Sequence, residues 1–188
     1  MSIVAFLGKA RSGKDTCGDF LVQHYGYKKY SFADPLKGAL RELFGFTHEQ
    51  LYGSKKEQVD TRWNISPREA MQVIGTEIAQ YTFPKVMPGL QTVVPENGFF
   101  VKCFQNWRKN HMRDALVITD VRFEHEIEAL LSMGATLIYI NRPEEYITTN
   151  VRKHSSEEVS KFKHFAHYTV ENTGTLEELY SNVTHILE

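Results

Sequence analysis

The chain has 188 residues, of which 41% are hydrophobic and 24% are charged, and its formal net charge at pH 7 is −1. Its composition excludes collagen-like and disordered chains, the presence of just Cys17 and Cys103 excludes a disulfide-rich secreted scaffold, and no apolar run reaches the roughly 18 residues of a membrane-spanning helix. The near-zero charge argues against binding to a nucleic-acid polymer but leaves room for a local anion site, and two distant thiols suit a reducing cytoplasm.

The first part of the chain predicts alternating strands and helices. The apolar run 3–7 is typical of a strand buried in a parallel sheet. A glycine-rich turn leads into a helix over 15–25, and a second strand is predicted over 28–32. A helix then begins at Pro35 and runs to about residue 44, with Asp34 as its N-cap.

The middle of the chain is polar, weakly patterned and predicted to be helical. Helices are predicted over 67–80 and 99–111, and the residues between them are rich in Pro and Gly. We interpret residues 45–112 as a helical insertion and not as a separate domain.

Strands and helices alternate cleanly again toward the C-terminus. Strands are predicted over 115–119, 136–140 and 168–170, and helices over 123–133 and 175–187. This alternation indicates βαβ units and a parallel sheet that helices cover on both faces.

The sharpest motif follows the first strand and reads Gly8-Lys9-Ala10-Arg11-Ser12-Gly13-Lys14-Asp15-Thr16. It fits G-x-x-x-x-G-K between a strand and a helix, which is the context of a phosphate-binding P-loop. Gly8 and Gly13 allow the backbone to turn successive N–H groups toward a phosphate, and Lys14 can reach the β- and γ-phosphate oxygens. A plain glycine-rich turn is the alternative.

Position 15 departs from the general motif, which has a Mg²⁺-binding Ser or Thr there. Here Asp15 is followed by Thr16. A carboxylate can bind a hard cation, and it can also orient or deprotonate an attacking group, so both roles stay open. The substitution argues against a GTPase switch protein.

Further charged residues follow the predicted strands, where the ligands of a doubly wound sheet bind. Asp120 is placed to assist Mg²⁺ or to hold a sugar hydroxyl, and Arg122 to bind a phosphate with its forked guanidinium. Glu126 lies one helical turn after Arg122, so a plain surface ion pair is the alternative for these two. Lys37 near a helix start suits a phosphate contact, with a solvated lysine as the alternative. Arg142 can stack on adenine or close over phosphates.

Four residues stand out within the insertion: Arg62, Arg68, Gly75 and Thr76. Arg68 lies near a helix start, where a basic residue is unfavourable. Gly75 destabilises a helix by about 1 kcal/mol relative to Ala, so we expect it to permit a close approach. Phe100 suits a hydrophobic core better than a surface on which a base stacks.

Together these segments resemble the phage-type deoxynucleoside monophosphate kinases, which belong to the P-loop nucleoside-monophosphate kinases. The resemblance spans the chain in order and is carried by residues 11–16, 30–40, 68–77, 120–126, 133–143 and 171–179. Thr173 stands where this family often has Asp, and the stretches 45–65 and 81–98 match poorly. The Asp after the P-loop lysine and the Asp-x-Arg-x-x-x-Glu segment are its most specific features.

The resemblance implies a three-layer α/β P-loop NTPase fold with a five-stranded parallel sheet. The single kinase domain would span 1–188, with an acceptor-binding insertion over 45–112 and a lid over 142–165. The implied reaction moves the γ-phosphoryl of ATP to a deoxynucleoside 5′-monophosphate with the help of Mg²⁺, giving ADP and a precursor for DNA synthesis. A homodimer in the cytoplasm is also implied.

The resemblance further implies roles for individual residues. ATP would be bound by Gly8, Arg11, Ser12, Gly13, Lys14, Asp15, Thr16 and Arg142. The acceptor would be bound by Leu36, Lys37, Arg62, Arg68, Gly75, Thr76, Phe100, Asp120, Arg122 and Glu126. Asp15 and Thr16 would hold Mg²⁺, and Lys14, Asp15 and Arg122 would be catalytic.

Two other functions fit the P-loop. One is another small-acceptor kinase, such as a dephospho-coenzyme A kinase. The other is a nucleotide-binding ATPase module without transferase activity, against which the arginines outside the P-loop argue, because they suit a second phosphorylated ligand.

Overall fold

A computed structural model describes residues 2–94, 97–143 and 160–188. The chain divides into two units. One, the sheet unit, comprises Met1–Ser31 and His111–Glu188, and the other, the helical unit, comprises Phe32–Asn110. The helical unit therefore begins earlier than the expected insertion and includes the helix that follows the second strand.

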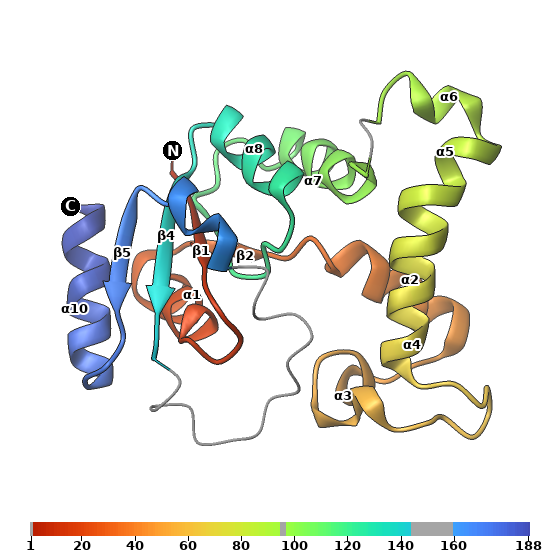
Figure 1. Cartoon of the computed structure of the whole chain (residues 1–188), viewed down its shortest axis with the longest axis horizontal. Coiled ribbons are helices and arrows are strands. Elements are labelled where there is room, and N and C mark those ends of the chain that lie inside the picture. The colour runs from red at the N-terminus through yellow and green to blue at the C-terminus, as the bar shows by residue number, and fades with distance from the viewer. Residues whose placement is uncertain (1, 95–96, 144–159) are drawn as a thin grey trace. The chain divides into compact units, whose positions relative to one another are not determined.

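The sheet unit contains five parallel strands in the order β2-β3-β1-β4-β5 (Figure 1). The strands are β1 (Ile3–Leu7), β2 (Lys28–Tyr30), β3 (Leu116–Ile118), β4 (Thr136–Asn141) and β5 (Tyr168–Glu171). This confirms the predicted five-stranded parallel sheet. Strand β2 ends at Tyr30, earlier than predicted, because its partner β3 ends at the residue opposite, Ile118.

Helices cover both faces of this sheet. They are α1 (Lys14–Tyr25), α8 (Glu124–Ser132) and α10 (Leu176–Leu187), and a short 3-10 helix, η4, spans Lys161–Phe165. The connections β1–α1–β2 and β3–α8–β4 run in opposite directions along the strand order, so right-handed crossovers place α1 and α8 on opposite faces. The predicted three-layer α/β fold is confirmed.

Successive side chains of each buried strand point to opposite faces of the sheet, and helices cover both faces to form the core of the sheet unit. On one face, α1 and α10 pack against side chains of four strands. That cluster contains Val4, Phe6, Cys17, Leu21, Val117, Ile138, Ile140, Val170, Leu179 and Val183. Helix α8 buries Ile127 and Leu130 completely.

The helical unit consists of short helices around a smaller core. They are α2 (Asp34–Phe44), α3 (His48–Leu51), η1 (Ser54–Glu57), α4 (Pro67–Gln72), η2 (Val73–Thr82, a π-helix), α5 (Phe83–Val86), α6 (Pro88–Gln91) and α7 (Phe99–Lys109). The core side chains Leu40, Phe46, Leu51 and Ala70 are buried together.

The predicted cap of α2 is wrong. Asp34 is the first helical residue, and the N-cap is Ala33, which has no capping side chain. The Asp34 carboxylate instead accepts a hydrogen bond from the Tyr52 hydroxyl at 3.2 Å, so it joins α2 to the end of α3.

Gly75 permits a close approach, as predicted. A Cβ at this position would lie 2.7 Å from Cδ2 of Leu36. Because real side chains do not pack this closely, glycine lets η2 and α2 come together within the helical unit.

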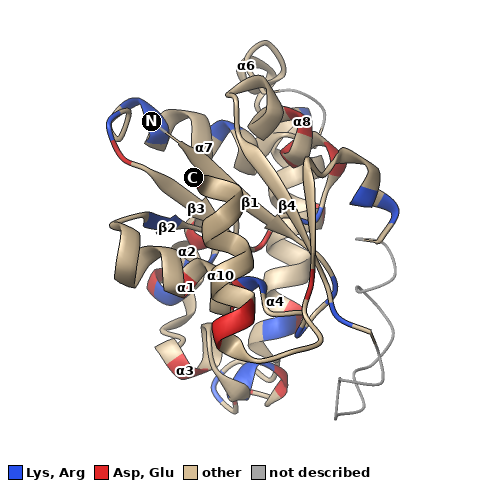
Figure 2. Cartoon of the chain, turned by 90° about the vertical axis from the view of Figure 1, so that its left-hand side faces the viewer, with Lys and Arg blue, Asp and Glu red and all other residues tan. Residues whose placement is uncertain are grey.

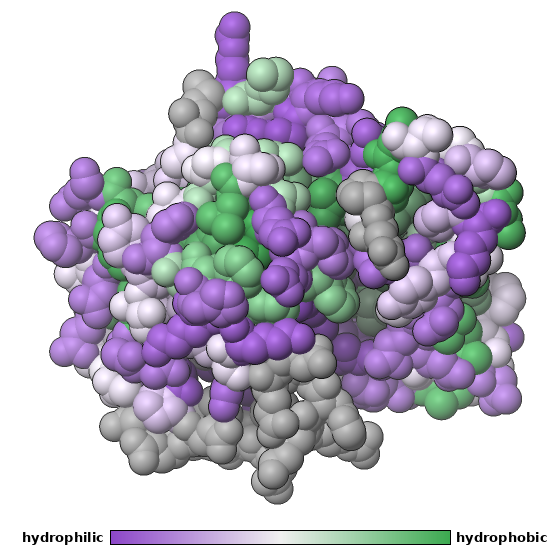
Figure 3. Space-filling view, turned by 45° about the horizontal axis from the view of Figure 1, so that its top comes forward, coloured by the Kyte–Doolittle hydropathy of each residue, from purple (hydrophilic) through white to green (hydrophobic). Residues whose placement is uncertain are grey.

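The surface shows charges of both signs. Basic and acidic positions are interleaved in the view of Figure 2, in keeping with the net charge of −1. Hydrophilic residues cover most of the face in Figure 3, with hydrophobic residues between them. In the parts of the chain that the structure describes, no helix is long and apolar enough to cross a membrane.

Candidate active site

The five parallel strands end at one edge of the sheet, and the segments that follow them carry most of the predicted site residues of this unit. The P-loop begins at Gly8, directly after β1. Thr119 follows β3, Arg142 follows β4 and Asn172 follows β5. Crevices outside the carboxyl ends of strands are the usual ligand sites of such sheets.

The phosphate loop has the backbone that its glycines predict. Gly8 and Gly13 have φ angles of 138° and 107°, and Arg11 is also left-handed at 63°. A Cβ at Gly8 would collide with the backbone oxygen of Ile140, so glycine is required there by space as well as by torsion. Gly13 is the N-cap of α1, and no described side chain caps this helix. The first N–H groups of α1 are therefore placed to receive an anion.

The Lys14 side chain is hydrogen-bonded to the backbone of this loop. Lys14 Nζ donates a hydrogen bond to the backbone oxygen of Lys9 at 2.6 Å. Burial lowers the pKa of Lys14 to about 8, although the negative charge of Asp15 opposes this shift, and the positive charge of Arg122 makes a smaller contribution in the same direction as burial. A bound polyphosphate would stabilise this partly desolvated ammonium.

Asp15 is held by two partners that the sequence did not reveal. Its Oδ1 accepts a hydrogen bond from the Thr119 hydroxyl at 2.5 Å and lies 3.3 Å from Lys29 Nζ. Lys29 also donates to Asp19 at 2.8 Å. Desolvation would raise the pKa of Asp15, but the Thr119 hydrogen bond and the Lys29 charge outweigh it and hold that pKa below its ordinary value. Asp15 is therefore a fixed, ionised carboxylate.

This donor set suits Mg²⁺. The described residues contain no cluster of three or more His, Cys, Asp or Glu that could hold a metal by themselves. Magnesium at a nucleotide commonly takes one or two protein carboxylates and completes its shell with phosphate oxygens and water. Asp15 is exposed on the first turn of α1, and Thr16 lies next to it with a hydroxyl.

Asp120 and Glu126 are the acidic residues on either side of Arg122 in the sequence. The Ser31 hydroxyl donates to Asp120 Oδ2 at 2.6 Å. Glu126 is 4% exposed, and its Oε2 accepts the backbone N–H groups of Arg122 at 2.7 Å and Phe123 at 3.1 Å. The alternative of a surface ion pair between Arg122 and Glu126 is wrong, because Glu126 is a buried cap of α8 that binds the backbone of Arg122.

Glu126 makes stability depend on pH. Burial raises its pKa from 4.5 to about 8, against the two backbone hydrogen bonds, and the charge of Asp120 adds to the rise. The folded protein then keeps a proton that the unfolded chain releases above pH 4.5, so stability falls as the pH rises through this window, by up to roughly 4 kcal/mol.

We expect Glu126→Gln to remove this slope, because an amide oxygen can accept both N–H groups and does not titrate. The measurement is the free energy of unfolding by denaturant at pH 5, 6.5 and 8. Glu128→Gln, on the exposed side of the same helix, is the matched control. Parallel pH profiles for Glu126→Gln and the unmodified protein would contradict the assignment.

Arg142 and Ser12 each hold a buried polar atom that lacks a hydrogen bond. Within the described ranges, Nε of Arg142 and the hydroxyl of Ser12 have no partner. Such atoms are costly unless a ligand or water satisfies them. The rest of the predicted lid, residues 144–159, lies outside the described residues.

The predicted acceptor residues of the helical unit lie in several local environments. Lys37 Nζ lies 4.1 Å from the centroid of the Tyr52 ring, and Arg68 Nε donates to Glu57 at 3.0 Å. Leu36 packs against Gly75, Thr76 is exposed, and the half-buried Phe100 makes an edge contact with Phe99.

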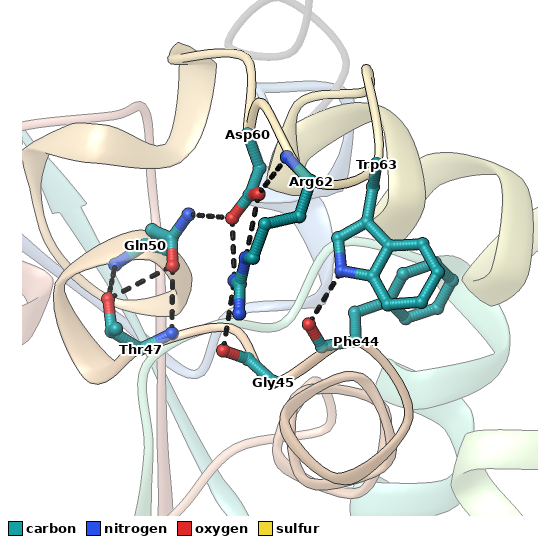
Figure 4. A network of polar contacts seen from close by, with 7 residues as sticks. All are labelled: Phe44, Gly45, Thr47, Gln50, Asp60, Arg62 and Trp63. Atoms are coloured by element: carbon teal, nitrogen blue, oxygen red, sulfur yellow. Dashed lines mark hydrogen bonds and ion pairs between the residues drawn. The ribbon is translucent and has the colours of Figure 1, made fainter.

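Arg62 is engaged in a network inside the helical unit (Figure 4). It donates to both carboxylate oxygens of Asp60, at 2.9 and 2.7 Å, and to the backbone oxygen of Gly45 at 3.1 Å. Hydrogen bonds from Arg62 and Gln50 hold the pKa of Asp60 well below its ordinary value. Next to it, the Trp63 indole donates to the backbone oxygen of Phe44 at 2.8 Å. In this arrangement Arg62 ties the loop after α2 to the segment before α4.

Sequence reasoning missed Lys29, Thr119 and Asn172. Thr119 and Asn172 each follow a strand directly, which is a signal that the sequence does carry. Lys29 lies within β2 and gives no such signal, since its contact with Asp15 depends on where α1 packs against the sheet.

Comparisons with known proteins identify the family of this chain. A family model described as deoxynucleotide monophosphate kinase matches residues 2–60 and 46–183. A protein of Acanthamoeba polyphaga mimivirus named as such a kinase is 34% identical over 190 residues, covering 97% of this chain and 94% of the relative. The deoxynucleotide monophosphate kinase of Enterobacteria phage T4 is 24% identical over 244 aligned positions, covering 100% of this chain and 99% of the relative.

Solved structures support the fold. Shikimate kinase from Aquifex aeolicus aligns with a TM-score of 0.53 and 17% identity over 98% of this chain and 95% of that one. The structure of TT1252 from Thermus thermophilus aligns with a TM-score of 0.51, covering 99% of this chain and 96% of that one. The predicted resemblance is confirmed: the chain belongs to the deoxynucleotide monophosphate kinase family and is a phosphotransferase with the P-loop kinase fold.

Proposed function

We propose that this protein transfers the γ-phosphoryl group of ATP to deoxynucleoside 5′-monophosphates, giving ADP and deoxynucleoside diphosphates. The observation that carries the proposal is the phosphate loop, which leads into the uncapped start of α1 and carries the Lys14 ammonium, in a chain of this family. Phosphoryl transfer requires little covalent chemistry from the protein, so positioning and charge stabilisation are the tasks of its residues.

The phosphate loop is assigned to ATP, the phosphoryl donor. Its backbone N–H groups and Lys14 bind the phosphates of ATP, and Arg142 covers the bound nucleotide. Asp15 and Thr16 would hold Mg²⁺, which would supply neutralisation of the negative charge of the nucleotide's phosphates. The unpartnered Nε of Arg142, among the described residues, supports its assignment to a ligand.

The acceptor side is assigned to Arg122 and to residues of the helical unit. In the sheet unit, Arg122 is assigned to the acceptor phosphate, which its forked guanidinium suits. In the helical unit, the family resemblance assigns Lys37 and Arg68 to the acceptor. Asp120, Leu36, Gly75, Thr76 and Phe100 contact the acceptor's sugar and base. Arg62 and Glu126 act indirectly, since Arg62 is bound to Asp60 and Glu126 caps α8 beside Arg122.

The direct test measures ADP production from Mg-ATP with each of dAMP, dCMP, dGMP and dTMP, the matching ribonucleotides, and dephospho-coenzyme A. We expect ADP only when a deoxynucleoside monophosphate is present. Equal ADP release without any acceptor would contradict the proposal and indicate an ATPase module. ADP release with dephospho-coenzyme A alone would contradict the proposed acceptor and indicate a dephospho-coenzyme A kinase.

Arg122→Ala tests the acceptor assignment. We expect kcat/KM to fall at least about tenfold, the effect of losing a contact of roughly 1.4 kcal/mol to the acceptor phosphate. The fold should persist, because Glu126 binds the backbone N–H of residue 122 and not its side chain. Arg113→Ala, which removes an exposed arginine elsewhere, is the control. An unchanged kcat/KM for Arg122→Ala would refute this role.

A further inference from the structure

Asn172, the residue directly after β5, is hydrogen-bonded to the backbone of the phosphate loop. Its Nδ2 donates a hydrogen bond to the backbone oxygen of Ser12 at 2.8 Å. Both residues are buried, with exposed fractions of 6% for Asn172 and 1% for Ser12. A buried amide donor on a buried carbonyl fixes the orientation of that peptide group, because breaking the bond leaves two polar atoms unsatisfied.

The sheet in turn fixes Asn172. Its backbone N–H donates to the backbone oxygen of Asn141 at 2.7 Å, which extends the ladder between β4 and β5 by one residue. Beside it, Nδ2 of Asn141 donates to Glu171 Oε2 at 2.7 Å. The position of the Asn172 side chain is therefore set by the end of the parallel sheet.

The hydrogen bond to Ser12 decides where the next N–H group points. No cis peptide bond occurs in the described chain, so the Ser12 carbonyl and the Gly13 N–H point in opposite directions. Gly13 is also fixed on its other side, since its carbonyl accepts the N–H of Cys17 at 2.9 Å and starts α1. A Cβ at Gly13 would lie 2.6 Å from Nδ2 of Asn172, so this contact also explains the glycine.

We propose that Asn172 is a positioning residue for phosphoryl transfer: it holds the Ser12–Gly13 peptide so that the Gly13 N–H is directed at the nucleotide's phosphates. The proposal rests on the proposed function, because it assigns the phosphates of ATP to this loop. Asn172 acts through the loop and not by contact with the reacting atoms. Fixed dipoles of this kind stabilise developing charge without reorganising during the reaction.

The test uses Asn172→Asp, which keeps the shape of the side chain but sets an acceptor oxygen against the Ser12 carbonyl. We expect the KM for Mg-ATP to rise at least about tenfold, while the KM for the deoxynucleoside monophosphate stays within about twofold. In ¹⁵N-labelled protein, the Gly13 amide resonance should shift on addition of ADP, and the variant should lose most of that shift. Asn182→Asp, the same change at an exposed position of α10, is the control.

The outcomes separate this proposal from the proposed function. If the unmodified protein binds no ADP, the proposed function fails. If it binds ADP and Asn172→Asp binds equally well with the same Gly13 shift, the role of Asn172 is refuted and the proposed function stands. If Asn172→Asp does not fold, Asn172→Ala removes the donor without adding a charge, and unaltered ADP binding by that variant refutes the role equally.

Discussion

Lys14→Ala is expected to reduce phosphoryl transfer by at least about a hundredfold while leaving the protein folded. Removing a single preorganised group that stabilises transition-state charge typically costs this much. Burial lowers the pKa of Lys14 to about 8, so an anionic ligand beside this ammonium would stabilise its charged form. The activity is measured as ADP formation with saturating Mg-ATP and a deoxynucleoside monophosphate.

The fold should tolerate Lys14→Ala. The folded protein desolvates this ammonium, as its lowered pKa shows, and recovers one hydrogen bond to the Lys9 backbone oxygen. Losing such a bond costs about 1 kcal/mol, and relief from the desolvation offsets part of that. Lys28→Ala is a matched control, because it removes a lysine paired with Asp114 on the surface of the same unit. Near-normal transfer by Lys14→Ala would overturn the assignment of the phosphate loop.

The phosphate loop could be predicted because its physics is local. Gly8 and Gly13 are required by backbone torsions within one turn, and the strand before and helix after them are adjacent in sequence. The same is true of Asp120 and Arg122, since residues that follow a parallel strand lie at the ligand edge wherever that strand sits in the sheet.

The partners of these residues could not be predicted, because they depend on strand order. The Thr119–Asp15 hydrogen bond joins positions 104 residues apart, and the Asn172–Ser12 bond joins positions 160 apart. Both contacts follow from β3 and β4 flanking β1 and from β5 lying beside β4, an order that hydrophobic periodicity does not contain.

Arg62 and Glu126 show a different limit of sequence reasoning. Each has the charge and spacing of a ligand-binding residue, yet each is bound within its own unit. For Glu126 the deciding quantity is burial, and for Arg62 it is the position of Asp60 two residues earlier. Residue type alone cannot distinguish a charged side chain that binds a ligand from one that is bound to the backbone or to a neighbouring side chain of the protein.

Asp15→Asn is expected to raise the Mg²⁺ concentration needed for half-maximal activity at least about tenfold, with partial recovery of the rate at high Mg²⁺. A neutral amide can still accept the Thr119 hydrogen bond, but it provides a weaker ligand to a hard cation. The alternative, a general base, fits the structure less well. A base works best with a pKa near the working pH, whereas Thr119 and Lys29 hold the pKa of Asp15 below its ordinary value.

The chemistry of the acceptor also argues against a base. A phosphate monoester loses its second proton with a pKa of about 6, so its oxygen can attack at neutral pH without a base on the protein. Titrating Mg²⁺ in the activity assay separates the two roles, with Asp19→Asn as the control, because Asp19 also binds Lys29 and carries the same charge. If Asp15 were the base, Asp15→Asn would lose the rate at every Mg²⁺ concentration with an unchanged midpoint. A shifted midpoint with a recovering rate assigns Asp15 to the metal, and Lys29 and Thr119 are then the residues that keep that ligand ionised and in place.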